Sequence, residues 1–149
     1  MNRRHLIRVL TMGSCAILFS TAAASAVERG NDKALHAGET LRYDRGLKIT
    51  FLAVRNDSRC PINAKCIWAG DAEVVLRVKA GSQAARRVTL HTNLKPQTVV
   101  IPAQVFPPGT AGIPKSYLIS IASLTPQPEA GRKTLQSDYR LKLDISVAQ

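Results

Sequence analysis

The chain has 149 residues, 45% of them hydrophobic, and its 21 lysines and arginines against 10 acidic residues give a net charge of +11. After the first 26 residues no stretch approaches the roughly 20 apolar residues that a transmembrane helix needs. No internal repeat or low-complexity linker indicates a second domain. The composition therefore excludes a transmembrane helix beyond residue 26 and a multidomain organisation, and the positive charge predicts adherence to polyanions.

Residues 1–26 have the features of a cleavable signal peptide. Three arginines precede an apolar run over residues 9–23, and Ala24-Ser25-Ala26 matches the small-residue pattern that signal peptidase recognises. We expect cleavage after Ala26, which leaves one domain of residues 27–149 in the periplasm or outside the cell. Removal of three arginines and no acidic residue lowers the net charge to +8, from 18 basic and 10 acidic residues.

Two short motifs bear on the export route. Arg3-Arg4-His5-Leu6-Ile7-Arg8 resembles a twin-arginine signal, which would imply export in the folded state. Met12-Gly13-Ser14-Cys15 loosely resembles a lipoprotein box, but the leucine usual at its first position is missing. We interpret Cys15 as an ordinary residue of the signal peptide.

The rest of the chain alternates apolar and polar residues at the period of β-strands. A short strand is expected at 39–43, and the next, 47–55, places Leu47, Ile49, Phe51 and Ala53 on one face. Strands 72–79 and 86–92 follow, joined by the turn Ala80-Gly81-Ser82. Further strands are predicted at 98–101, 117–121 and 139–147.

About seven strands without a convincing helix predict an all-β fold. The strand number and the turns rich in Gly and Pro favour a single immunoglobulin-like β-sandwich, with a small β-barrel as the alternative. Residues 105–115 and 125–137 are expected to be loops, because prolines in them restrict the backbone and remove hydrogen-bond donors.

The segment 57–70 contains both cysteines that remain after signal removal. Cys60 and Cys66 are separated by five residues, and an even number of cysteines in an oxidising compartment predicts a disulfide. Such a small ring should stabilise the fold by roughly 2 kcal/mol. No metal site and no cofactor are expected, because zinc needs about four N or S ligands and the only histidines after the signal are His36 and His91.

The same segment carries a sequence resemblance. Asp57-Ser58-Arg59-Cys60-Pro61, followed by Cys66-Ile67-Trp68-Ala69-Gly70 and an alternating strand, resembles a motif of small uncharacterised bacterial secreted proteins and lipoproteins. Leu124-Thr125-Pro126-Gln127-Pro128 and Ser137-Asp138-Tyr139-Arg140 are also similar to that family. The resemblance implies export, one disulfide and a β domain, and it carries over no catalytic residues.

Two interpretations of this motif are open. In the structural one, Asp57 stabilises a turn, Gly70 permits a bend, and Trp68 packs against the disulfide or the sheet beneath it. Arg59 then pairs with Asp57 or with Asp71. In the functional one, Asp57, Arg59 and Trp68 belong to a recognition loop, since Arg and Trp are enriched at interface hot spots.

Basic residues on outward strand positions suggest a second surface. Lys48, Arg77, Lys79, Arg140 and Lys142 would form one basic face if their strands share a sheet. The alternative is that they are ordinary solubilising residues, which also discourage edge-to-edge pairing of strands. The expected polyanions are lipid head groups, lipopolysaccharide or anionic wall polymers, and not nucleic acid.

Enzymatic chemistry has little support in the sequence. Neither histidine lies in a nucleophile-elbow context, and His91 is expected at the surface. Asp57 and Asp71 flank the disulfide and could form a carboxylate pair. We therefore expect a non-catalytic binding or accessory module of the cell envelope, with an unidentified protein or an anionic envelope component as its partner. The alternative is a secreted inhibitor of a hydrolase, such as a protease or lysozyme.

Overall fold

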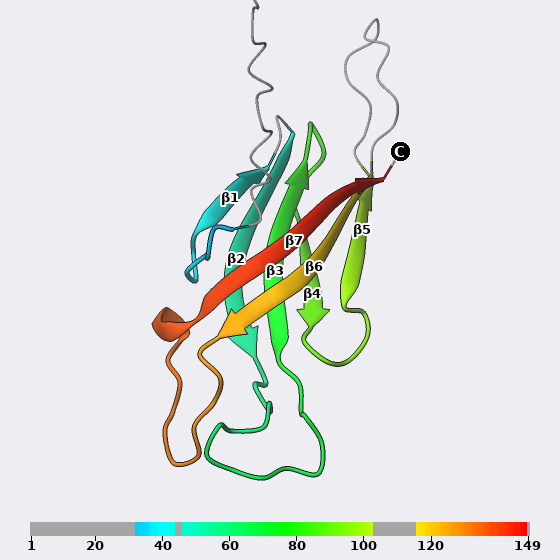
Figure 1. Ribbon diagram of the computed structural model, residues 1–149. Coiled ribbons are helices and arrows are strands. Elements are labelled where there is room, and N and C mark those ends of the chain that lie inside the picture. Colours follow the sequence, from blue (N-terminus) through cyan, green and yellow to red (C-terminus); the bar gives the residue numbers. More distant parts are fainter. Residues whose placement is uncertain (1–31, 44–45, 103–115, 149) are drawn as a thin grey trace, which may run out of the picture.

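The computed structural model describes residues 32–43, 46–102 and 116–148. Within these residues the chain forms seven strands and one short 3-10 helix, η1 (Figure 1). Their bounds are β1 (Thr40–Tyr43), β2 (Leu47–Arg55), β3 (Glu73–Ala80), β4 (Arg86–His91), β5 (Thr98–Pro102), β6 (Ser116–Thr125), η1 (Gln136–Asp138) and β7 (Arg140–Ala148).

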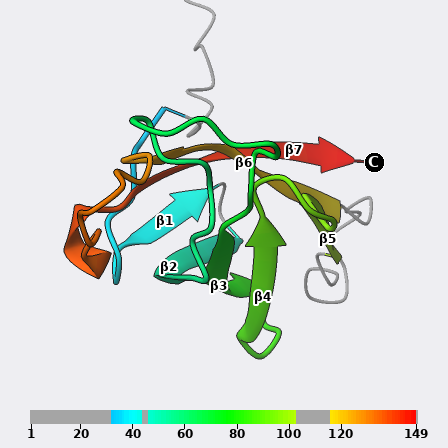
Figure 2. The same cartoon turned by 90° about the horizontal axis from the view of Figure 1, so that it is seen from below.

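The strands form two antiparallel sheets that face each other. One sheet has the order β1-β2-β3-β4 and the other the order β5-β6-β7. Viewed from below, the β5-β6-β7 sheet forms a layer over the four-stranded one (Figure 2). The two sheets are not closed into a barrel. The predicted all-β sandwich is therefore confirmed, with the four-plus-three strand count of immunoglobulin constant-type domains and strands that follow the chain order within each sheet.

The core lies between the sheets because alternate residues of each strand point inward. Phe51 and Leu76 from the larger sheet share one buried cluster with Ile119 and Leu143 from the smaller sheet. Leu35, which precedes β1, bridges to Leu141 of β7 through two backbone hydrogen bonds. This bridge connects the N-terminal part of the described chain to the smaller sheet.

The predicted strands correspond to the observed ones, with differences at their ends. The largest difference is β6, which continues to Thr125 beyond the predicted end at residue 121. A register shift between Ile121 and Ser123 explains this, because it interrupts the regular alternation on which the prediction relied. The predictions for residues 1–26, including Cys15, and for the loop 105–115 lie outside the described residues. Among the described helices none is long and apolar enough to cross a membrane.

The five cations expected on one face divide between the two sheets. Lys48, Arg77 and Lys79 are exposed on β2 and β3 of the larger sheet, whereas Arg140 and Lys142 belong to β7 of the smaller one. Arg140 also has a local structural role: its Nη1 atom donates to the carbonyls of Ser137 and Asp138 at 2.8 and 3.0 Å. The five residues therefore do not form a single basic face.

Candidate functional site

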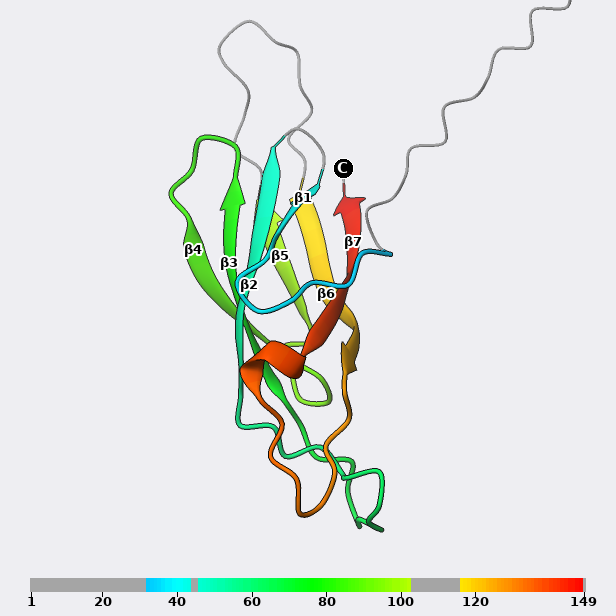
Figure 3. The same cartoon turned by 90° about the vertical axis from the view of Figure 1, so that its left-hand side faces the viewer.

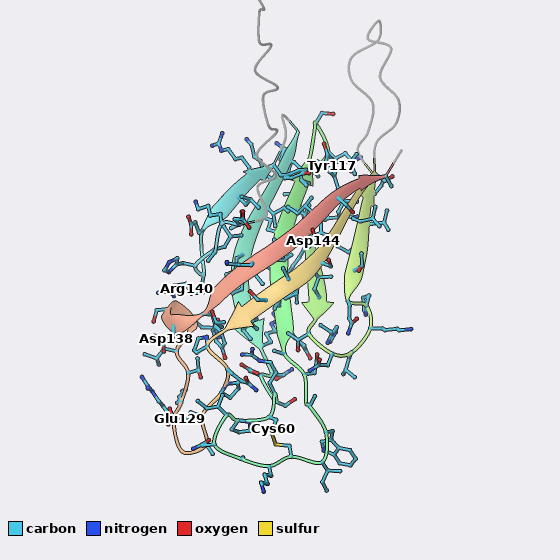
Figure 4. The ribbon with its side chains drawn as sticks, viewed as in Figure 1. Cys60, Tyr117, Glu129, Asp138, Arg140 and Asp144 are labelled. Carbon is cyan, nitrogen blue, oxygen red and sulfur yellow. A yellow bond between two sulfur atoms is a disulfide. The ribbon has the colours of Figure 1, made fainter. Side chains whose placement is uncertain are left out.

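The disulfide motif forms a loop at one end of the sandwich. Residues 56–72 connect β2 to β3 and extend beyond the ends of both sheets (Figures 1 and 3). The predicted bond between Cys60 and Cys66 is present, with Cα atoms 5.8 Å apart. Figure 4 shows the labelled Cys60 in the loop at the lower end of the molecule.

Backbone hydrogen bonds hold the two arms of this loop together. The Ser58 N–H donates to the Asp71 carbonyl at 2.7 Å, and the Cys60 N–H donates to the Ala69 carbonyl at 2.8 Å. Gly70 lies between these pairs with a φ of +68°, and a Cβ atom there would stand 1.8 Å from the Ser58 carbonyl oxygen. The close approach of the two arms therefore requires glycine at position 70, as the sequence predicted.

A second loop, residues 126–135, supports the disulfide loop from the side. The Ile62 N–H donates to the Pro128 carbonyl at 2.9 Å, and the Gln127 side chain donates to the Cys60 carbonyl at 2.9 Å. The Asn63 side chain accepts from the Ala130 N–H at 2.7 Å and donates to the Ala130 carbonyl. The two loops run next to each other at the lower end of Figure 3.

Arg59 connects these loops through a buried cluster. Its Nε and Nη2 atoms donate to the two carboxylate oxygens of Asp57 at 2.8 and 2.7 Å. The remaining donors reach the carbonyls of Leu124 at 2.6 Å and Pro126 at 2.8 Å. The side chains of Arg59 and Asp57 are only 10% and 9% exposed. This geometry selects Asp57 as the partner of Arg59 and gives no support to a recognition role for either residue.

Tyr139, which lies between η1 and β7, completes the cluster. Its hydroxyl donates to Asp57 Oδ2 at 2.9 Å. Burial raises the pKa of Asp57, but hydrogen bonds from Arg59 and Tyr139 outweigh it, so the pKa of this carboxyl lies below its usual value. Burial and the bond to Asp57 together raise the pKa of Tyr139 to about 12. The cluster is therefore most stable with Asp57 ionised and Tyr139 protonated.

Asp71 anchors the other end of the loop and was not predicted to do so. Its carboxylate accepts from the Asn93 and Leu94 amides at 2.8 and 3.2 Å, and it lies 2.6 Å from His91 Nδ1. Burial raises the pKa of Asp71, yet these bonds and one from Thr92 outweigh it and lower the pKa to about 2. His91, which was expected at the surface, is partly buried, with 20% of its side chain exposed.

Trp68 has the opposite environment from Arg59. The expectation that it packs against the disulfide or the sheet is wrong, since it is 78% exposed. Ile67 and Ile62 on the same loop are 93% and 66% exposed. We call Ile62, Ile67 and Trp68 the apolar tip. Of the three residues expected to take part in recognition, only Trp68 is available to a partner.

The two carboxylates near the loop have separate hydrogen-bond partners. Asp57 pairs with Arg59 and Asp71 with His91, so the two carboxylates do not share a site. In the described part of the chain the His91 side chain hydrogen-bonds to Asp71 and to no serine or threonine hydroxyl. That same part contains no cluster of three His, Cys, Asp or Glu side chains able to hold a metal ion.

Comparisons with protein-family models, curated proteins and solved structures gave no significant match. The resemblance to the bacterial secreted family therefore stays a prediction from the motif alone.

Proposed function

We propose that this protein is an exported, non-catalytic binding module of the cell envelope that recognises a partner protein through the apolar tip. The observation that carries the proposal is the exposure of Trp68 together with Ile62 and Ile67 on one stapled loop. The partner that fits is a protein with an apolar pocket able to receive an indole ring.

The exposed tip has an energetic reason to bind. Complete burial of a large apolar side chain is favourable by about 1.5–3 kcal/mol relative to exposure, and the fold itself leaves these three side chains in water. Trp is also among the residues that most often dominate protein interfaces. Burial of the tip against a partner would recover free energy that folding does not.

The loop is held in shape before binding. The disulfide, the paired arms and the contacts of Ile62 and Asn63 with the second loop all restrict its backbone. A preorganised loop loses little conformational entropy when it binds. The same property favours the alternative function, a secreted inhibitor that inserts the tip into the cleft of a hydrolase.

The test compares wild-type protein with Trp68→Ala and Ile67→Ser in binding to solubilised envelope proteins of the native host. A partner retained by the wild-type protein is identified, purified and titrated by calorimetry. We expect each variant to raise the measured Kd at least tenfold. Replacement of a hot-spot residue at an interface typically costs roughly 2 kcal/mol or more of binding free energy. Val100→Ala is the matched control, because Val100 is 54% exposed on β5, away from the tip.

The outcomes separate the two functions. A partner that is a hydrolase, and whose activity falls when wild-type protein is added, supports the inhibitor function. A non-hydrolytic partner that loses affinity for Trp68→Ala supports the binding module. Equal Kd values for wild type, Trp68→Ala and Ile67→Ser would exclude the apolar tip as the contact surface.

A further inference from the structure

The outer face of the larger sheet carries a regular array of cations that the sequence alone did not assemble. The strand register aligns Arg42, Lys48 and Lys79 as direct neighbours on β1, β2 and β3. One step along the strands, it aligns Arg77 of β3 with Arg87 of β4. All five residues are exposed, and we call them the cationic face.

Sheet geometry sets the spacing of this array. Adjacent strands lie about 4.8 Å apart, and successive outward residues of one strand lie about 7 Å apart. The backbone positions of the three cations in the first row thus fall within about 10 Å. In the second row, Arg77 is the next outward residue of β3 before Lys79, and Arg87 lies beside Arg77 on β4. The result is a cluster of positive charge on one side of a single sheet.

Nothing in the described part of the chain neutralises these cations. None of the five side chains forms an ion pair or hydrogen bond with a described residue. The four strands contain a single acidic residue, Glu73. Glu73 lies at the opposite end of the sheet, where it pairs in register with Arg55 and accepts a hydrogen bond from Asn56.

The uncompensated charge opposes folding. Like charges placed directly opposite on neighbouring strands are destabilising, and the register places Lys48 opposite both Arg42 and Lys79. An external layer of anions would remove this repulsion. The outer face of the smaller sheet differs, because in its strands Lys142 is accompanied by Asp144.

We infer that the cationic face adsorbs to a membrane surface that contains anionic phospholipids. Charge complementarity supports this occupant, since each Lys or Arg near such a surface strengthens binding about fivefold. All five cations lie on the same face of one sheet, so they can approach a layer of head groups together. The outward positions of both rows hold Arg, Lys and Thr and no aromatic ring, so the face offers no platform on which sugars or bases could stack.

This surface is distinct from the proposed recognition loop. The cationic rows lie beside the β1–β2 and β3–β4 connections, whereas the disulfide loop follows the other end of β2 (Figure 1). Adsorption through the cationic face would leave the apolar tip at the far end of the sheet. The two proposals can therefore fail independently.

The test is cosedimentation of the purified protein with vesicles of phosphatidylcholine containing 30% phosphatidylglycerol, and with pure phosphatidylcholine vesicles as reference. The double variant Lys48→Gln/Lys79→Gln should bind the anionic vesicles about 25-fold more weakly than wild type, given about fivefold for each cation. Its melting temperature should not fall, because the substitutions remove only like-charge neighbours. If the protein is prepared with residues 1–26, the apolar run 9–23 is the same in every variant. The pure phosphatidylcholine vesicles then measure the binding that this run contributes.

The matched control is Lys133→Gln/Lys142→Gln, which changes the net charge equally at exposed positions outside the cationic face. It should bind within about twofold of wild type, because charges farther from the membrane than the Debye length of roughly 8 Å are screened. Equal losses for both double variants would mean that net charge alone acts, and would overturn the proposal.

Two further outcomes would also contradict it. Loss of vesicle binding in Trp68→Ala but not in Lys48→Gln/Lys79→Gln would mean that the apolar tip inserts into the membrane instead. Face-dependent binding to soluble inorganic polyphosphate without binding to anionic vesicles would assign the cationic face to a soluble polymer.

Discussion

At the scale of single residues, Arg59 and Trp68 have opposite environments in the disulfide loop: the first is buried and the second is exposed. Arg59 uses its guanidinium to hold the Asp57 carboxylate and two carbonyls, one at the end of β6 and one just after it. The Trp68 side chain is exposed to solvent and does not pack in the core. The two residue types that suggested recognition in the sequence therefore have different energetic roles.

Substitution of Arg59 should affect stability, and substitution of Trp68 should not. Arg59→Ala leaves a buried carboxylate unpaired, which typically costs about 3–5 kcal/mol. Trp68→Ala removes an exposed side chain and should change the free energy of unfolding by less than about 0.5 kcal/mol. Urea denaturation of both variants measures these values.

Arg59→Lys is the informative control for this pair. It keeps the positive charge but loses the planar group that contacts both carboxylate oxygens. Its unfolding free energy should fall between wild type and Arg59→Ala. An unchanged urea midpoint for Arg59→Ala would show that the cluster contributes nothing to the fold.

At the scale of elements, the alternating strands could be predicted from the sequence and the loop could not. Most of Leu47–Arg55 and Arg140–Ala148 alternates because one face of each strand contacts the core, so the period identifies them. A register shift after Phe51 then buries Val54 in place of Ala53, which the period had placed on the inward face. Trp68 misled the prediction because an isolated tryptophan beside a disulfide suits a buried site equally well. Its exposure depends on the direction of the loop, which contacts with residues 126–135 determine.

The Asp71–His91 contact could have been predicted from the sequence. The predicted hairpin around Gly81 already implies that the start of β3 lies beside the end of β4, where Asp71 and His91 stand. The contacts of Arg59 with Leu124 and Pro126 carried no comparable signal, because they join segments that only the packing of the two sheets brings together.

Removal of the disulfide should weaken the loop without unfolding the domain. Cys60→Ser/Cys66→Ser restores freedom to the unfolded chain, and we expect a loss of about 2 kcal/mol for a ring of this size. Thermal unfolding with and without a reductant measures the effect. The reductant should lower the melting temperature of the wild type but not of the double variant, and an equal decrease in both would contradict a role for this bond.

At the scale of the whole molecule, three titratable groups set a pH range of maximum stability. The pKa of Asp71 falls to about 2 and that of Asp57 also decreases from its usual value of 3.8, so their stabilisation is complete above pH 4 and is lost as the pH falls toward 2. The pKa of Tyr139 rises to about 12 from 10, so its stabilisation is complete below pH 10 and is lost as the pH rises through 12.

Urea midpoints measured between pH 2 and pH 12 should therefore be highest between about pH 4 and pH 10. Asp71→Asn should be less stable than wild type at pH 6 and should lose less stability on acidification. Tyr139→Phe should flatten the alkaline decrease. An acid decrease equally steep in Asp71→Asn and wild type would attribute it to general charge repulsion and not to Asp71.

The hydrogen bonds between the two loops have a consequence for local opening of the native state. The amides of Cys60, Ile62 and Ala130 lie outside both sheets, yet each donates to a partner within the loop pair. Amide hydrogens whose hydrogen bonds break in the same local opening exchange with solvent as one cooperative unit. In hydrogen–deuterium exchange these three amides should be protected to a similar degree, and Arg59→Ala should accelerate them together while β3 stays protected.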